Sequence, residues 1–328
     1  MKHRKNAKSM LFFVAIFALL MVMLYSGFRI LEATVFYEPS ATEQTVQRKT
    51  IVREGVEYFP RQDITVVMVL GIDQYGPVED SGTYNNHGAA DVVMLMIFDE
   101  KYETYHILQL NRDTMVEMPV LGIGGKEAGT YYGQLALSHT YGSGLEDSCE
   151  NTRKTVSNLL YGIHIDYYIS MNMDAISILN DAVGGVTVNV TEDFSKVDAS
   201  IQKGEMTLMG QQAVNYVRTR KDVGDQLNLT RLKRHREYMD GFWKAFQQKD
   251  AEDPQFIIKA YQDASPYLVS DCSVNVISGM ADRYGDYTMG EIYIPSGENI
   301  MSEKYYEFHL DEEKLDELII QLFYEVKK

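Results

Sequence analysis

The chain has 328 residues, of which 45% are hydrophobic and 24% are charged. This composition excludes intrinsic disorder and low-complexity fibres, and it indicates one large globular domain or two small ones. With 31 Lys and Arg against 47 Asp and Glu, the formal net charge is −16. A phosphate backbone favours a surplus of cations, so this charge argues against nucleic acid as a partner. Any anion site must therefore be a local basic cluster.

The N-terminal segment differs from this average. A basic head without acidic residues occupies residues 1–9, and an apolar run follows from Met10 to Phe28. As a helix with a rise of about 1.5 Å per residue, this run would span about 28 Å, close to the ~30 Å hydrocarbon core of a bilayer. We predict one transmembrane helix over 10–28, with the basic head in the cytoplasm and everything after Arg29 outside the cell. A cleaved signal peptide is the alternative, but no small-x-small cleavage site follows the run.

A stalk and one folded domain are expected after the membrane helix. Residues 29–60 are polar and mixed and predict an extracellular stalk, whereas residues 61–328 contain no repeat or linker and predict a single domain. The domain opens with an almost unbroken β-branched and apolar run, Ile64–Asp73, which is typical of a strand buried on both faces. Two further runs, Asp91–Asp99 and Thr104–Leu110, predict neighbouring strands.

Helical and strand patterns alternate through the rest of the chain. Helices are expected over 151–160, 173–183, 210–220, 230–248, 253–264, 274–283 and 311–326, and strands over 166–170, 186–190, 287–294 and 305–310, the last two as a pair. This alternation predicts an α/β fold in which a central, mainly mixed β-sheet is covered by helices on both faces, an α-β-α arrangement.

The two cysteines, Cys149 and Cys272, leave two alternatives open. In an oxidising exterior they could form one disulfide, or they could be two buried thiols, because sequence does not fix their separation. No metal-type spacing surrounds either cysteine and the histidines are scattered, so a zinc site is not expected.

A basic cluster late in the chain departs most strongly from the acidic average. Seven bases fall within 19 residues: Arg218, Arg220, Lys221, Arg231, Lys233, Arg234 and Arg236. With Thr230 as N-cap, Arg231 and Arg234 lie near a helix N-terminus, where free amides and the helix dipole favour an anion. Arginine also suits the bidentate geometry of phosphate. A solvated helix face is the alternative.

A second group of charged residues is expected at one edge of the sheet. Asp73 ends the first strand, Asp91 begins the second, and Arg112 and Asp113 follow the third. If the first two strands are antiparallel neighbours, the two acids lie side by side at an edge where functional sites collect. Two carboxylates without histidines suit a hard cation such as Mg²⁺. An aspartate at a strand end is more often a turn or cap residue, so this prediction depends on their joint placement.

Nucleophilic acyl chemistry and P-loop hydrolysis are disfavoured, because the chain has no GxSxG elbow and no GxxxxGK[ST] loop. The Gly-rich stretches 122–125 and 141–144 lack a strand-turn-helix context and are expected to be loops.

Several segments, in this order, are similar to the LytR-CpsA-Psr family of cell-envelope proteins. They are VLGID (69–73), ADVVML (90–95), NRDT (111–114), IDYYISMNM (165–173), DAVGGVTVNV (181–190), GQQAVNYVRTR (210–220) and GDQLNLTRLKRHREYM (224–239). The resemblance covers about residues 61–328. A short cytoplasmic head, one transmembrane helix and an external domain also match the family's layout.

The resemblance implies an activity. Family members are implied to transfer a glycopolymer from a polyprenyl-pyrophosphate carrier to a sugar hydroxyl of peptidoglycan, with Mg²⁺ as cofactor. The implied pyrophosphate site is lined by arginines, and the lipid tail is implied to occupy an apolar pocket inside the fold. The helices that follow Met173 and Thr230 are the expected walls of that pocket.

The resemblance also implies site residues. By position, the family's metal-associated acids correspond to Asp73 and Asp91. The pyrophosphate-binding positions correspond to Arg112, Arg218, Arg220, Asp225, Arg231 and Arg234. We expect Arg112, Arg218 and Asp113 to take part in catalysis; either Asp113 or Asp225 could be a general base, or could orient an arginine.

This chain departs from the family pattern at three places. Ala89-Ala90 stand where Arg-Ser is common, Asn111 replaces a proline, and His235 replaces a glutamine. The first departure removes a cation and favours an alternative, a non-catalytic module that binds lipid-linked or wall polymers. A polyprenyl-pyrophosphate pyrophosphatase is a further alternative. A transcription regulator is disfavoured by the predicted cell-membrane location and the acidic exterior.

Overall fold

The computed structural model describes residues 50–122, 124–219, 222–224, 228–253, 256–272, 276, 279–280, 283–284 and 286–326, without the side chains of 228–232, 250, 257–258 and 261. The predicted cytoplasmic head, the transmembrane helix at 10–28 and the stalk up to residue 49 lie outside these ranges. Most of the expected helix at 274–283 does too. Within the described ranges, no helix combines the length and apolar character needed to cross a membrane.

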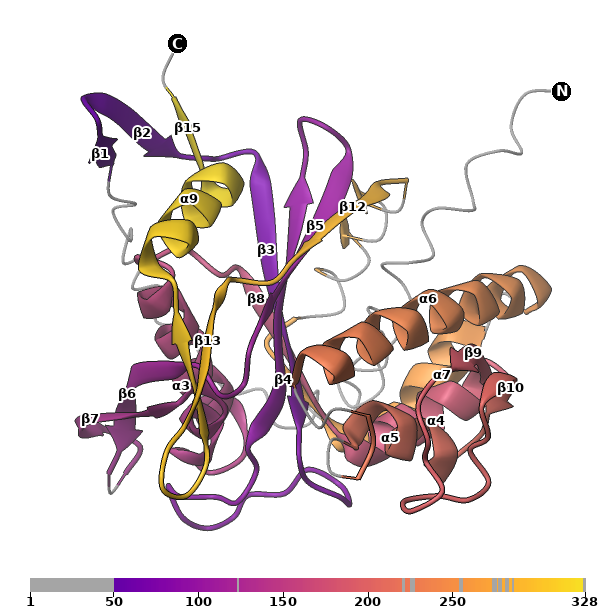
Figure 1. Ribbon diagram of the computed structural model, residues 1–328. Helices are drawn as coiled ribbons and strands as arrows, with labels where there is room; N and C mark the ends of the chain where they lie inside the picture. The colour runs from indigo at the N-terminus through magenta and orange to yellow at the C-terminus, as the bar shows by residue number, and fades with distance from the viewer. Residues whose placement is uncertain are drawn as a thin grey trace, which may run out of the picture.

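A central mixed sheet organises the fold (Figure 1). Among the described residues it has six strands in the order β11-β8-β3-β4-β5-β12. These are β11 (Leu268–Ser270), β8 (Tyr167–Asn172), β3 (Ile64–Ile72), β4 (Ala90–Asp99), β5 (Thr104–Leu110) and β12 (Thr288–Tyr293). β3, β4 and β5 form an antiparallel meander, while β8 runs parallel to β3 and β12 parallel to β5. The predicted mixed α/β sheet is therefore confirmed.

Helices pack against both faces of this sheet. Alternate residues of β3 face opposite sides, so Met68 packs in one cluster with α3 (Glu146–Leu159) and α9 (Glu312–Phe323). Its neighbour Val67 packs in another cluster with α6 (Asn228–Glu252). Both faces are thus covered by apolar side chains, which explains why the β3 run shows no polar alternation.

Apart from the clusters on the two sheet faces, the elements on the right of Figure 1 pack around an apolar cluster of their own, called the second core below. It contains α4 (Met173–Ala182), α5 (Gln211–Arg218), α6, α7 (Phe256–Ala264) and the antiparallel pair β9 (Val186–Val190) and β10 (Gly204–Leu208). Gly241 of α6 lies so close to β9 that a Cβ there would be 2.4 Å from the carbonyl oxygen of Thr187. A larger residue would push the helix and the strand apart.

The folded region begins earlier than the predicted boundary at residue 61. β1 (Ile51–Arg53) and β2 (Val56–Pro60) form a hairpin, and β15 (Tyr324–Val326) pairs with β2. Residues 51–60, assigned above to the stalk, therefore belong to a small sheet that joins both ends of the domain. Because residues 324–326 pair with β2 as strand β15, the last helix ends at Phe323 and not at residue 326.

Two hairpins were not predicted. β6 (Met115–Leu121) pairs with β7 (Glu127–Gln134), and β13 (Gly297–Met301) pairs with β14 (Tyr306–Leu310). The prediction that the strands near 287–294 and 305–310 pair with each other is wrong, because β12 joins the central sheet and β14 pairs with β13. The partner of β12 is distant in the sequence, whereas β14 forms a local hairpin with the strand that directly precedes it.

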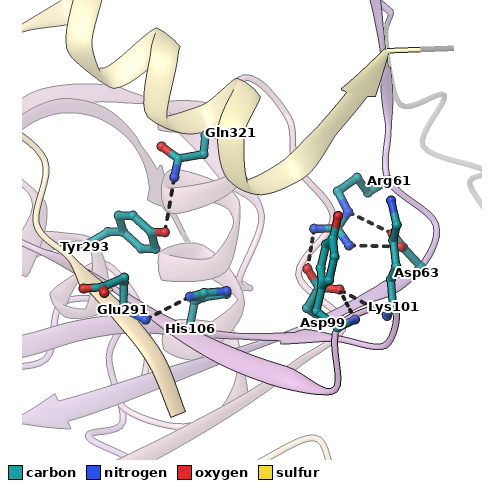
Figure 2. Close-up of polar contacts among 9 residues, drawn as sticks. Arg61, Asp63, Asp99, Lys101, His106, Glu291, Tyr293 and Gln321 are labelled. Carbon is teal, nitrogen blue, oxygen red and sulfur yellow. Dashed lines mark hydrogen bonds and ion pairs between the residues drawn. The ribbon is translucent and has the colours of Figure 1, made fainter. Parts of the chain in front are cut away.

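Polar side chains hold the end of the sheet opposite Asp91 (Figure 2). Arg61 donates from Nε and Nη2 to both carboxylate oxygens of Asp63 at 2.9 Å and from Nη1 to Asp99 Oδ2 at 2.6 Å. The hydrogen bonds from Arg61 hold the pKa of Asp63 below its usual value. On the same side, His106 Nδ1 accepts from the Glu291 backbone N–H at 3.1 Å, which fastens β12 to β5.

Cys149 and Cys272, both within the described ranges, are buried thiols without a disulfide. Burial raises the pKa of both, that of Cys272 to about 12. The alternative of two buried small hydrophobic residues is the one that the structure supports.

Candidate functional site

Asp73 and Asp91 lie at the same edge of the central sheet. The Asp73 backbone N–H, directly after β3, donates to Ala89 O at 2.9 Å. In the ladder, Gly71 is paired with Val92 but Ile72 with Ala90. Asp91 is therefore the extra residue of a β-bulge, a feature that re-aims side chains and is common beside functional sites.

Arg112 joins this edge from the neighbouring strand. It follows β5, and its Nη1 forms an ion pair with Asp91 Oδ1. Asn111 shapes the turn: its Oδ1 accepts from the Asp113 N–H at 3.0 Å and its carbonyl accepts from the Thr114 N–H at 3.0 Å. The Asn111 side chain thus fixes this turn.

Asp113 supports Arg112 from behind. Its side chain is buried, and Oδ1 lies 3.4 Å from Arg112 Nε and accepts from Gln134 Nε2 at 3.0 Å. A buried carboxylate that accepts from Gln134 and forms an ion pair with the guanidinium is placed to orient the arginine. This geometry favours the orienting role of the two roles that the sequence left open.

Arg218 reaches the edge from the other side, at the C-terminal end of α5. Its Nε and Nη2 lie 2.9 and 2.8 Å from Asp73 Oδ1. The guanidinium carbon lies 5.6 Å from the centroid of the Tyr75 ring, in a cation–π arrangement. Arg112 and Arg218 therefore each pair with one of the two acids at this edge.

Arg234 has a different environment from Arg112 and Arg218. It is only 3% exposed, its Nη2 donates to the carbonyl oxygen of Thr219, and its guanidinium lies over the Phe194 ring. This position holds the backbone just after Arg218. Arg220 and Asp225 lie outside the described residues, as does the side chain of Arg231.

An apolar cavity of about 130 Å³ adjoins this edge. It lies between the sheet and the helices α4, α5 and α6, and the apolar side chains around it are Val69, Leu70, Val92, Met94, Met171, Met173, Ile176, Leu179, Val217, Tyr238, Met239 and Phe242. Asp91, Arg218, Asn172 and His235 also line it. The helices after Met173 and Thr230 therefore form walls of an apolar cavity, as predicted, and this cavity has charged groups among its lining.

Comparison with models of protein families shows which family the chain belongs to. Residues 32–323 match the model of the LytR_cpsA_psr family. The chain belongs to this family. The match extends over the central sheet and over the edge that carries Asp73, Asp91, Arg112 and Arg218.

Curated LytR-CpsA-Psr relatives carry names that state an activity. The chain is 28% identical to the polyisoprenyl-teichoic acid–peptidoglycan teichoic acid transferase TagU of Bacillus licheniformis, over 59% of this chain and 56% of the relative. It is 26% identical to TagU of Bacillus subtilis over 67% and 65%, and 31% identical to TagT of Bacillus subtilis over 54% and 52%. The matched stretches thus span about half to two thirds of the relatives' own length.

Solved structures of the LytR-CpsA-Psr family share the fold. TagT bound to LI-WTA is 25% identical, with a TM-score of 0.59 over 88% of this chain and 98% of that one. TagV of B. subtilis is 23% identical, with a TM-score of 0.61 over 80% and 96%. Transferase names and a shared fold therefore accompany the site geometry.

Two buried polar residues behind this edge of the sheet, Asn86 and His139, were not predicted from the sequence. Asn86 Nδ2 donates to the carbonyl oxygens of His139 and Gly142 at 2.8 and 3.0 Å, and Asn86 Oδ1 accepts from the Gly88 N–H at 2.6 Å. His139 Nδ1 donates to Gly88 O at 2.8 Å. These bonds fix the loop that leads into β4 and hence the position of Asp91. A buried asparagine or histidine is not recognisable from sequence, because burial depends on the packed fold.

His235 also helps to fix the site. Its Nε2 lies 2.9 Å from the carbonyl oxygen of Val217 and its Nδ1 lies 3.4 Å from Gln109 Nε2. Since a carbonyl oxygen only accepts, Nε2 donates and Nδ1 accepts. This histidine connects α6 to the residue before Arg218 and to β5.

Proposed function

We propose that this chain is a membrane-anchored phosphotransferase that moves a glycopolymer from a polyprenyl-pyrophosphate carrier to a sugar hydroxyl of peptidoglycan in cell-wall assembly. One observation carries the proposal: an apolar cavity whose lining includes Asp91 and Arg218, with Arg112 paired to Asp91 and Arg218 paired to Asp73 at the same sheet edge. Such a site suits a ligand with a long apolar tail and an anionic head. The transferase names of the relatives support it.

The two arginines are suited to this reaction. The acceptor oxygen forms a bond to the phosphorus that carries the glycan, its proton passes to solvent, and the polyprenyl phosphate leaves with the electrons of the broken P–O bond. Negative charge builds on the phosphate oxygens during this exchange, so catalysis depends mainly on positioned cations. Arg112 and Arg218 would bind these oxygens, and Asp113 would orient Arg112.

Mg²⁺ is the proposed cofactor, and Asp73 and Asp91 would hold it. The described residues contain no group of three or more His, Cys, Asp or Glu that could hold a metal ion. Two carboxylates still suit Mg²⁺, which prefers hard oxygen ligands and is commonly bound by one or two carboxylates together with substrate phosphates and water. When bound, Mg²⁺ would neutralise charge on the pyrophosphate.

The proposed location is the cell membrane, with the N-terminus in the cytoplasm and the catalytic domain outside. The basic head and the apolar run at 10–28 support it, and they are features of the sequence. The net charge of −16 is consistent with partners other than nucleic acid.

A non-catalytic binding module is the second candidate, and Ala89-Ala90 favour it. Both residues are alanines, so neither supplies a cation to the site. The carbonyl oxygen of Ala89 accepts from the Asp73 N–H, and Ala90 is fully buried. A polyprenyl-pyrophosphate pyrophosphatase is the third.

One assay separates the three functions. The full chain in detergent is given a lipid-pyrophosphate-linked oligosaccharide and peptidoglycan, with Mg²⁺ or with EDTA. Transfer of the glycan to peptidoglycan, lost in EDTA, is the expected result. Ligand binding without product would favour the binding module. Cleavage of the pyrophosphate without transfer would favour the pyrophosphatase.

A further inference from the structure

Tyr75 lies beside the arginine that lines the cavity. The Arg218 guanidinium carbon is 5.6 Å from the Tyr75 ring centroid, and the same guanidinium pairs with Asp73. Tyr75 is 50% exposed and is not among the residues that line the cavity. Arg218 therefore borders both the apolar cavity and an aromatic ring that faces solvent.

The backbone on each side of this tyrosine is fixed. The carbonyl oxygen of Gln74 accepts from the Met173 N–H at 2.9 Å. The Gly76 N–H donates to Asp174 Oδ2 at 2.5 Å, and the Gly76 carbonyl accepts from Asn172 Nδ2. These bonds tie the loop to the junction of β8 and α4, which also borders the cavity. The ring is therefore presented to solvent on a fixed segment, which lowers the entropy cost of binding a ligand there.

A half-exposed aromatic ring beside a phosphate-binding arginine suits a sugar. One face of a pyranose carries several C–H groups, and the electron-rich face of an aromatic ring packs well against them. The tyrosine hydroxyl can also exchange hydrogen bonds with sugar hydroxyls. A glycan joined to a pyrophosphate therefore has its first sugar next to the anion that Arg218 would bind.

We propose that Tyr75 forms a subsite for the first sugar of the donor, the pyranose joined directly to the pyrophosphate. This inference rests on the proposed function and adds a specificity residue to it. In this arrangement the lipid tail lies in the cavity, the pyrophosphate lies at Arg218, and the sugar stacks on Tyr75 outside the cavity. A purely positioning role, in which Tyr75 acts only by holding Arg218, is the competing explanation.

Two ligands distinguish these explanations. Farnesyl pyrophosphate carries the tail and the anion, and farnesyl-pyrophosphoryl-N-acetylglucosamine adds one sugar. Dissociation constants are measured by calorimetry on the full chain in detergent, for the wild type, Tyr75→Ala and Tyr75→Phe. The matched control is Tyr102→Ala. Tyr102 is 64% exposed, also lies beside a cation, Lys101, and follows β4 at the opposite end from Asp91.

Tyr75→Ala is expected to weaken binding of the sugar-bearing ligand by about tenfold, or about 1.4 kcal/mol. Its affinity for farnesyl pyrophosphate should stay at the wild-type value. Tyr75→Phe should bind both ligands nearly as well as the wild type, because the ring remains, and Tyr102→Ala should change neither affinity.

Three results would overturn the subsite. Equal losses for both ligands in Tyr75→Ala would mean that Tyr75 only positions Arg218. Unchanged affinity for both would remove Tyr75 from the site. A wild-type chain that binds neither ligand would refute the proposed function, and the subsite with it; binding of both ligands by the wild type leaves the function standing when the subsite alone fails.

Discussion

Asp91 and Arg112 form an ion pair between neighbouring strands at the edge of the central sheet. The β-bulge in β4 aims the carboxylate, and the turn that follows β5 delivers the guanidinium. A local irregularity in one strand and a turn after the next thus combine to set the relative position of a carboxylate and a cation.

Replacing Arg112 by alanine should lower transfer activity by about 100-fold or more, because a cation that binds the developing phosphate charge is lost. Arg112→Lys should not restore full activity, since a single ammonium lacks the planar fork of arginine. The measurement is the rate of glycan transfer from a lipid-pyrophosphate donor with Mg²⁺, after thermal melts show that both variants fold. Wild-type turnover in folded Arg112→Ala would remove this arginine from the mechanism.

Filling the cavity should prevent lipid binding. Ile176 of α4 lines the cavity, and Ile176→Trp would place a larger apolar side chain in about 130 Å³ of space. Ile178 of the same helix packs on the second core and is not among the lining residues, so Ile178→Trp is the matched control. Polyprenyl phosphate should co-purify with the wild type and the control and should be absent from Ile176→Trp by mass spectrometry. Equal lipid content in all three would place the tail elsewhere.

His139 should make stability depend on pH. Its side chain is 1% exposed, and burial lowers its pKa to about 4. The unfolded chain binds a proton near pH 6.5 and the folded chain does not until about pH 4, so the free energy of unfolding should fall as pH decreases across this window, by up to about 3 kcal/mol.

The test is urea unfolding at several pH values for the wild type and His139→Asn, whose amide can still donate to the Gly88 carbonyl. The variant should lose stability at pH 7, because its side chain is smaller, but its stability should vary less between pH 6.5 and 4. His87 is exposed, so His87→Asn should keep the wild-type slope. An unchanged slope in His139→Asn would assign the pH dependence to other groups.

Gly241 should be required for packing of α6 on β9. Alanine normally stabilises a helix interior relative to glycine by about 1 kcal/mol, but here the added Cβ would meet Thr187 O at 2.4 Å and Val186 Cγ1 at 2.9 Å. Gly241→Ala should therefore destabilise the domain by roughly 1–3 kcal/mol, in the range of overpacking. Among the described residues, no atom lies within 4 Å of the corresponding Cβ at Gly279, so Gly279→Ala should be neutral or stabilising. Chemical denaturation compares the two, and an unchanged or increased stability of Gly241→Ala would contradict the close approach.

The proposed topology can be tested with a single cysteine. Both native thiols are buried, so a new cysteine at position 45 should be the main site of labelling on the folded protein. Thr45→Cys should react with an impermeant thiol reagent on intact cells, because residues after Arg29 are predicted to lie outside. Labelling only after lysis would place this segment in the cytoplasm.

The sequence by itself determined the central strands and the residues at their ends. Buried strands such as β3 and β4 appear as continuous apolar runs, because both of their faces are covered, and this signal is local. Asp73 and Arg112 were found for the same reason, since each directly follows such a run. The seven motifs also carried the family resemblance without any knowledge of the contacts between them.

Only the tertiary structure decided features that depend on partners distant in the chain. The β7 strand is almost wholly exposed, so it has no apolar pattern, and the parallel pairing of β12 with β5 cannot be read from either segment alone. The bulge at Asp91 depends on the register between β3 and β4. The burial of Arg234 and the position of Tyr75 beside Arg218 arise from packing between helices and loops. A charged residue has the same identity in a core, in an ion pair or in a site, and its surroundings, which only the fold supplies, decide which of these it is.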